Sequence, residues 1–104
     1  DDIEDEDSLR GNDVPGMMSL HSIAQRAATE ADIADAKDRR DKILSTYDLQ
    51  PPRRRYVHNC FLKATARRGD FKAALEAFEL MVATDVPLNE KTFGKVLIAC
   101  STSK

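Results

Sequence analysis

Apolar residues recur at intervals of three and four over residues 71–81, where they form one stripe: Phe71, Ala74, Leu75, Phe78 and Met81. This spacing matches one face of a helix with 3.6 residues per turn, so the segment is predicted to be an amphipathic α-helix. The strand pattern is poor, because no long run of Val, Ile, Tyr or Thr alternates with polar residues. The pattern therefore predicts an all-α fold.

A turn at Arg68-Gly69-Asp70 separates this helix from the one before it. Gly69 is predicted to end a helix over about 56–68, because glycine readily adopts the positive φ of a helix C-terminus. Asp70 is predicted to cap the next helix by accepting a backbone hydrogen bond. Residues 55–89 are thus expected to form a helical hairpin.

Comparable signals predict three more helices. Ser19 is expected to cap the first of them, and Asp32 is expected to cap a second that reaches about Tyr47. The Pro-Pro pair at 51–52 is expected to end that hairpin, because proline disrupts a helix interior. Asn89 is expected to cap a last helix, which stops within the given sequence.

Short motifs recur on both sides of the central hairpin. Residues 32–36 (DIADA) resemble 70–74 (DFKAA) at a separation of 70 − 32 = 38 residues. Residues 92–97 (TFGKVL) resemble 57–62 (VHNCFL) at a separation of 92 − 57 = 35 residues. A helical hairpin that recurs at such a period is typical of an α-solenoid, whose extended face binds a partner.

This period divides the chain into four parts. We expect an acidic disordered tail (1–16), a degenerate helical-hairpin repeat (17–54), a complete repeat (55–89) and the first helix of a further repeat (90–104). The last helix would leave an apolar face uncovered, and repeat proteins usually cap such a face. We therefore expect more repeats to follow in the parent protein.

The net charge of −2 conceals an uneven distribution. Residues 1–14 carry seven acids against one base, so the remainder has 15 bases and 11 acids and a net charge of +4. The tail has almost nothing to bury and is expected to be disordered. Its acids either stay solvated or shield the basic body until a polyanion displaces them.

The sequence lacks the residue patterns that several kinds of functional site require. Cys60 and Cys100 lie 40 residues apart, without the paired spacing of a zinc site, and are expected to be small buried hydrophobes. Gly94-Lys95 lacks the glycine-rich segment of a phosphate-binding loop. We expect no catalytic site, metal or cofactor, no membrane-spanning segment and no secretory leader. The protein is therefore not expected to be an enzyme.

The residues of the central hairpin resemble the pentatricopeptide repeat family. The positions that carry the resemblance are Phe61, Leu62, Arg67, Arg68, Gly69, Ala74, Phe78 and Met81, with the closing segment 85–89 and the helix-like segment 90–101. The departures are His58 in place of an aromatic residue, the order Pro87-Leu88, and the long junction 51–54. The tetratricopeptide repeat is the alternative, but its Trp-x-x-Leu-Gly-x-x-Tyr pattern is absent from the helix.

The resemblance implies two base-reading residues, Asn59 and Asn89. An amide donates and accepts hydrogen bonds, so it can pair with the edge of an unstacked base, and the Asn/Asn pair resembles a pyrimidine-preferring combination. The alternative is that Asn89 is only a helix cap and Asn59 only a solvated residue. His21, Pro51 and Gly94 occupy the matching positions of the other repeats and are poor readers of a base.

The resemblance also implies that Tyr56 stacks against bases and that Arg67 neutralises phosphate. Lys63 and the three residues Arg53, Arg54 and Arg55 would extend a basic stripe that contacts phosphates. The alternative is a solvated face whose charge is balanced by acids of the neighbouring helices.

Two functions are consistent with these features. The first is a single-stranded RNA-binding helical-repeat protein of mitochondria or chloroplasts, acting in RNA processing, stability or translation, as the resemblance implies. The second is a non-enzymatic protein–protein scaffold or a structural subunit of a large organellar assembly such as a ribosome. The degenerate first repeat favours the scaffold, whereas Asn59, Asn89 and Arg67 favour RNA binding.

Overall fold

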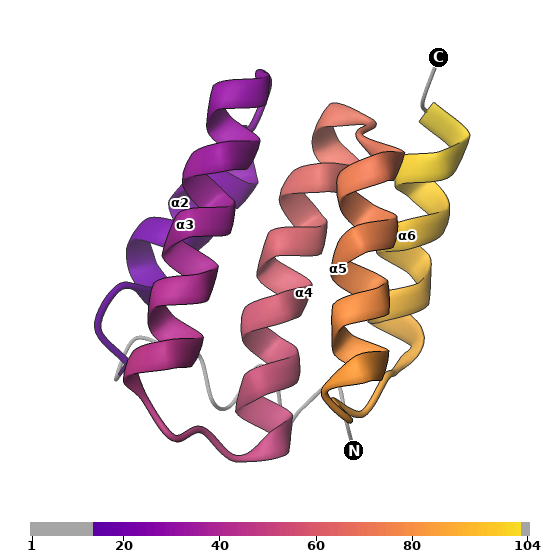
Figure 1. The fold of residues 1–104 in the computed structure, drawn as a ribbon. Helices are drawn as coiled ribbons and strands as arrows, with labels where there is room; N and C mark the ends of the chain where they lie inside the picture. Colours follow the sequence, from indigo (N-terminus) through magenta and orange to yellow (C-terminus); the bar gives the residue numbers. More distant parts are fainter. Residues whose placement is uncertain (1–13, 103–104) are drawn as a thin grey trace.

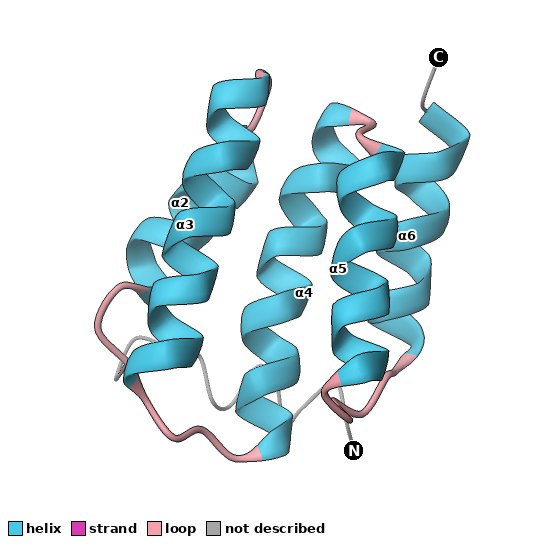
Figure 2. Ribbon diagram, in the orientation of Figure 1, coloured by secondary structure: helices cyan, strands magenta, loops and turns pink. Residues whose placement is uncertain are grey.

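A computed structural model describes residues 14–102, which form five α-helices and contain no strand (Figures 1 and 2). The helices are α2 (Met17–Arg26), α3 (Glu30–Thr46), α4 (Pro51–Arg68), α5 (Phe71–Ala83) and α6 (Glu90–Thr102). The prediction of an all-α fold is confirmed. None of these helices is long and apolar enough to cross a membrane.

Helix α4 is the centre of the fold. It packs against each of the other four helices, while α2 also packs on α3 and α5 also packs on α6. Figure 1 shows α3 to the left of α4 and α5 to its right, with α2 behind α3 and α6 behind α5. Helices α2, α4 and α6 therefore share one face of the molecule, and α3 and α5 share the opposite face.

The start of the fold differs from the prediction. Gly16, with φ 96°, precedes α2, so Ser19 lies inside the helix and does not cap it. The carbonyl of Val14 accepts a hydrogen bond from Met17 N at 3.1 Å, and the Val14 side chain is buried. The ordered structure thus includes residues 14–16, which were assigned to the disordered tail; residues 1–13 lie outside the described range.

Helix α3 begins with a reciprocal cap. The Thr29 hydroxyl accepts from Asp32 N at 3.1 Å, and the Asp32 carboxylate accepts from Thr29 N at 3.1 Å. Ala28 N also donates to the Asp32 carboxylate, at 2.9 Å. The bonds from Ala28 N and then Thr29 N are the largest causes that hold the pKa of Asp32 below its ordinary value. The prediction that Asp32 is the cap is wrong by one turn, because the hydroxyl of Thr29 takes that position.

Helix α4 begins five residues earlier than predicted. Pro51 and Pro52 are its first two residues instead of a separator between hairpins. Proline is tolerated there because the backbone N–H groups of the first turn have no acceptor within the helix, so the missing N–H of proline removes no hydrogen bond. The proposed boundary between residues 54 and 55 therefore falls inside a helix.

The turns after α4 and α5 match the prediction. Gly69 ends α4 with φ 78°, and Asp70 Oδ1 accepts from Ala73 N at 3.1 Å to cap α5. Asn89 Oδ1 accepts from Thr92 N at 3.0 Å and caps α6. A Cβ atom on Gly69 would lie 2.9 Å from Thr102 Oγ1, so this glycine also allows the end of α6 to approach the turn.

The core is formed around α4. Its fully buried large side chains include Phe61 and Leu62, which pack with small residues and with Leu20 and Met81 of neighbouring helices. Each buried large side chain contributes roughly 1.5–3 kcal/mol relative to an exposed one. Cys60 is buried as expected, but Cys100 is exposed, because no helix covers that side of α6 in the described residues.

Candidate nucleic-acid interface

A depression of about 170 Å³ lies on the face shared by α2, α4 and α6. It is lined by seven side chains from these three helices: His21, Tyr56, Asn59, Cys60, Lys63, Lys91 and Lys95. Three of the predicted site residues, Tyr56, Asn59 and Lys63, thus meet in one place. The same depression gathers four residues that were not assigned to the site.

Helical spacing explains how these side chains come together. Tyr56, Asn59 and Lys63 follow each other at intervals of three and four along α4, so they project from one side of the helix. Lys91 and Lys95 are four residues apart on α6 and therefore share a side as well. Because α4 packs against α6, the two rows of side chains face one shallow space.

Three lysines, Lys63, Lys91 and Lys95, line the depression, and all three are half-buried. Among residues 14–102, no Asp or Glu lines it. Burial lowers the pKa of His21 from its ordinary value, and the positive charge of Lys63 lowers it further. The basic groups among the described lining residues are therefore the three lysines, whose positive charge suits an anionic ligand.

His21 leaves one ring atom without a partner. Gln25 Nε2 lies 3.1 Å from His21 Nε2, whereas Nδ1 of the same ring is buried and has no hydrogen-bond partner. A buried polar atom without a partner costs free energy, so the position of this ring is a local cost of packing α2 on the rest of the fold.

Asn59 and Asn89 lie next to each other, in a buried hydrogen-bond network that joins α4 to α6. The two side chains are only 3% and 9% exposed. Thr92 Oγ1 donates to Asn59 Oδ1 at 2.8 Å, and Asn59 Nδ2 donates to Asn89 Oδ1 at 3.4 Å. The two side chains thus join α4 to α6. Asn59 is therefore not a solvated residue, and Asn89 is more than a helix cap.

The arginines predicted to contact phosphate are spread along α4. Arg67 is exposed and lies on the same helix side as Lys63, one turn further on, outside the depression. Arg53, Arg54 and Arg55 lie in the first turn, about 20 Å from Arg67 at 1.5 Å per residue. Arg55 is buried, and the charge of Arg54 acts on His58, toward α3. The structure does not unite these residues in one cluster.

The sequence contained a signal for the residues that were missed. His21, Tyr56 and Lys91 are spaced by 56 − 21 = 35 and 91 − 56 = 35 residues, and all three line the depression. Lys95 follows Cys60 by the same interval. Lys91 and Lys95 are identified when the 35-residue period is applied to every position of this face and not to the base-reading positions alone.

Within residues 14–102, no group of three or more His, Cys, Asp or Glu side chains is placed to hold a metal ion. No family model, curated protein or solved structure matches this chain.

Proposed function

We propose that this protein is a helical-hairpin repeat protein that binds single-stranded RNA on the face formed by α2, α4 and α6. The observation that carries the proposal is that three lysines, from α4 and α6, line the same depression as the aromatic ring of Tyr56. Lysines provide sequence-independent attraction to phosphates, and an aromatic ring provides a stacking surface for an unpaired base.

A depression of about 170 Å³ is large enough for one base or one phosphate group. Recognition of RNA by aromatic and amide side chains generally requires bases that are unstacked and exposed. The order of the helices, in which α2, α4 and α6 lie side by side, supports the resemblance to pentatricopeptide repeats.

A filter-binding titration with a pyrimidine-rich single strand tests the proposal. Replacing Lys63, Lys91 and Lys95 by Ala should weaken binding about tenfold or more and reduce the salt slope by about 2, since each phosphate contact contributes about 0.7. The matched control replaces three lysines on the opposite face: Lys37, Lys42 and Lys72. The proposal fails if the chain does not bind at low salt, or if both triple variants lose the same affinity.

Base reading by Asn59 and Asn89 is a separate part of the proposal. A base would have to compete with Thr92 for the amide of Asn59, because these groups already bond to each other. Asn59→Ala with Asn89→Ala should abolish any pyrimidine preference, measured by comparing oligo-U, oligo-C and oligo-A below the melting temperature of the variant. An unchanged preference would show that the two residues serve only the packing of α4 on α6.

A protein–protein scaffold is the second candidate, and the surface of α6 favours it. Phe93, Leu97 and Ile98 are 47%, 67% and 51% exposed, which is unusual for three large apolar residues on one short helix. Such a surface fits a structural subunit of a larger assembly, for example an organellar ribosome. If single strands do not bind at low salt, this candidate replaces RNA binding. For either candidate, the proposed location in mitochondria or chloroplasts depends on the resemblance to pentatricopeptide repeats alone.

A further inference from the structure

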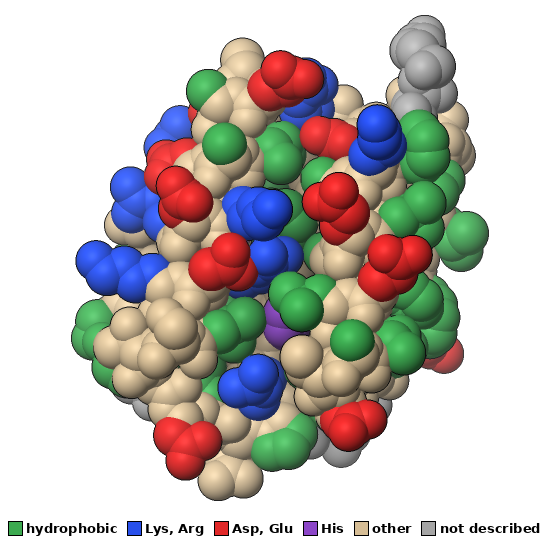
Figure 3. Space-filling view, in the orientation of Figure 1, with side chains coloured by type: hydrophobic (Ala, Val, Ile, Leu, Met, Phe, Trp, Pro, Cys, Tyr) green, Lys and Arg blue, Asp and Glu red, His purple; other side chains and the backbone are tan. Residues whose placement is uncertain are grey.

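A groove of about 650 Å³ runs between α3 and α5, on the face opposite to the candidate RNA site. Figure 3 views this face, with basic side chains in the hollow and acidic ones along its sides. Phe61 of α4 lies in its floor, and three small residues, Ala34, Ala73 and Ala77, line its walls. Both helices pack on α4, but alanines are too short to close the space between them.

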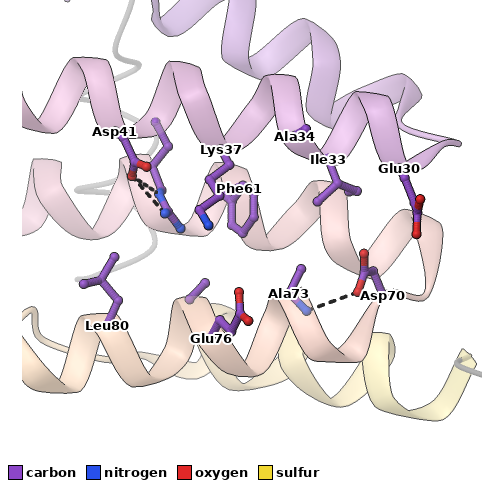
Figure 4. A pocket seen from close by; sticks show the side chains of 12 residues that line it. Glu30, Ile33, Ala34, Lys37, Asp41, Phe61, Asp70, Ala73, Glu76 and Leu80 are labelled. Carbon is purple, nitrogen blue, oxygen red and sulfur yellow. Dashed lines mark hydrogen bonds and ion pairs between the residues drawn. The ribbon is translucent and has the colours of Figure 1, made fainter.

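The two ends of the groove differ in charge. Figure 4 shows Glu30 of α3 and Asp70, at the start of α5, at the same end. Lys37 lies near the middle and Asp41 toward the other end. Arg40, which bonds to Asp41, also lines the groove. The lining contains four acids and two bases in total, so the groove disfavours a nucleic acid and suits a ligand that carries both signs of charge.

Arg40 is an unusual feature of this groove. It is only 4% exposed, and its guanidinium lies 4.5 Å from the centre of the Phe61 ring. Its Nε and Nη2 atoms donate to Asp41 Oδ1 at 2.9 and 2.8 Å. A guanidinium has five N–H donors, and Asp41 satisfies only two of them. A buried arginine with unused donors at the wall of a groove is well suited to a second carboxylate.

The dimensions define the shape of the ligand. Ten residues of α3 separate Glu30 from Arg40, which corresponds to about 15 Å along the groove. The volume of the groove is the space open to the centre of a water molecule, so the width over that length is about 9 Å once the diameter of the water, about 2.8 Å, is added. That width is slightly less than the 10–12 Å diameter of an α-helix. An extended chain covers the same 15 Å with about five residues.

We propose that the α3–α5 groove binds an extended segment of a partner protein, about five residues long, with a basic side chain at one end and an acidic side chain at the other. The basic group contacts Glu30 and Asp70, and the acidic group contacts Arg40 and Lys37. An apolar side chain between them packs against the alanines that line the walls of the groove. This site is independent of RNA binding and uses the opposite face of the protein.

A displayed library of random heptapeptides, selected on the full chain, tests this proposal. Enriched peptides should carry Lys or Arg three or four residues from Asp or Glu, with an apolar residue between them. Ala34→Phe fills the groove from an exposed position and should weaken these peptides about tenfold. Ala31→Phe, at an exposed position of α3 outside the groove, should leave their affinity unchanged.

A second pair of variants tests the charge complementarity. Glu30 and Glu90 are both exposed and are the first residues of α3 and α6, so replacing either by Lys has a similar effect on its own helix. Glu30→Lys should weaken the selected peptides about fivefold or more, whereas Glu90→Lys should not. Exchanging the basic residue of the peptide for Glu should restore binding to the Glu30→Lys variant.

Three results would overturn the proposal. The first is that no peptide is enriched, and the second is that enriched peptides lack the paired charges. The third is that they bind Ala34→Phe as tightly as the original protein. If Ala34→Phe but not Ala31→Phe loses affinity for the single strand used in the RNA titration, the groove belongs to a nucleic-acid surface instead.

Discussion

Helices α4 and α6 show how one sequence pattern leads to two different environments. Leu62 and Leu97 occupy matching positions 35 residues apart, yet Leu62 is fully buried and Leu97 is 67% exposed. His58 and Phe93 match in the same way, and the more polar residue is the buried one, at 1% against 47%. The difference arises because four of the described helices pack around α4, whereas α6 packs mainly against α4 and α5.

This comparison separates the contribution of a residue from that of its surroundings. The apolar pattern makes each segment helical, but it does not supply the neighbouring helix that removes the side chain from water. The stability of α4 should therefore respond to substitutions that α6 tolerates at the equivalent positions. The following predictions test this difference, beginning with the largest effect.

The leucine pair should give the greatest contrast. Leu62→Ala is expected to destabilise the fold by about 4 kcal/mol, because it removes buried apolar surface and leaves a cavity. Leu97→Ala should change stability by about 0.5 kcal/mol or less, because most of that side chain already contacts water. Urea unfolding of the whole chain, followed by circular dichroism, measures both values. Equal losses would show that α6 is covered in solution by another copy of the chain.

The histidine in α4 should make stability depend on pH. Burial lowers the pKa of His58 from 6.5 to about 4, and the positive charges of Arg40 and Arg54 contribute, while Asp41 opposes the shift. Both ring nitrogens are buried without a hydrogen-bond partner. The folded state thus binds a proton less readily than the unfolded state. The contribution of neutral His58 to the free energy of unfolding is therefore complete above pH 6.5. It is lost as the pH falls toward 4, by about 3 kcal/mol in total.

An imidazole NMR titration, combined with unfolding curves at several pH values, tests the prediction for His58. The matched control is Phe93→His, which places a histidine at the exposed position of α6, where an ordinary pKa of about 6.5 is expected. A His58 that titrates at the same pH as this control would contradict its buried environment.

The glycine pair should give the smallest effects, with opposite signs. Gly69→Ala is expected to cost about 1–2 kcal/mol, since φ is 78° and the new Cβ would lie 2.9 Å from Thr102 Oγ1. Gly94→Ala, within α6, should stabilise the fold by about 0.5–1 kcal/mol, because a Cβ there meets no atom within 4 Å. Thermal melts of the two variants measure the difference. A stabilising Gly69→Ala would show that the turn can adopt another conformation.

Local signals accounted for much of the fold. The positions of Gly69, Asp70 and Asn89 depend on the bonds and dihedral angles of a few adjacent residues, so the sequence indicates them directly. The start of α4 was missed because Pro51 and Pro52 are compatible both with the end of a hairpin and with the first turn of a helix. Ser19 was misassigned for a similar reason, since a backbone turn at Gly16 begins α2 without a side-chain cap.

The candidate site was predicted only in part. Tyr56, Asn59 and Lys63 share one side of a helix, and this follows from their spacing. The contribution of Lys91, Lys95 and His21 depends on how three helices pack side by side, which single-helix patterns do not specify. The burial of Asn59 against Thr92 also depends on that packing, and it changes the expected role of the residue.

The sequence by itself determined that the chain is helical and where several of its turns lie, because these features arise from the local periodicity and from caps. It also indicated that the final helix would expose apolar residues, as Phe93 and Leu97 do. Only the tertiary structure decided which charges meet. It assembled lysines around Tyr56 on one face, and it buried Arg40 over Phe61 beside a groove on the other. Both arrangements depend on the distances between helices, which are set by the sum of many side-chain contacts and not by any one segment.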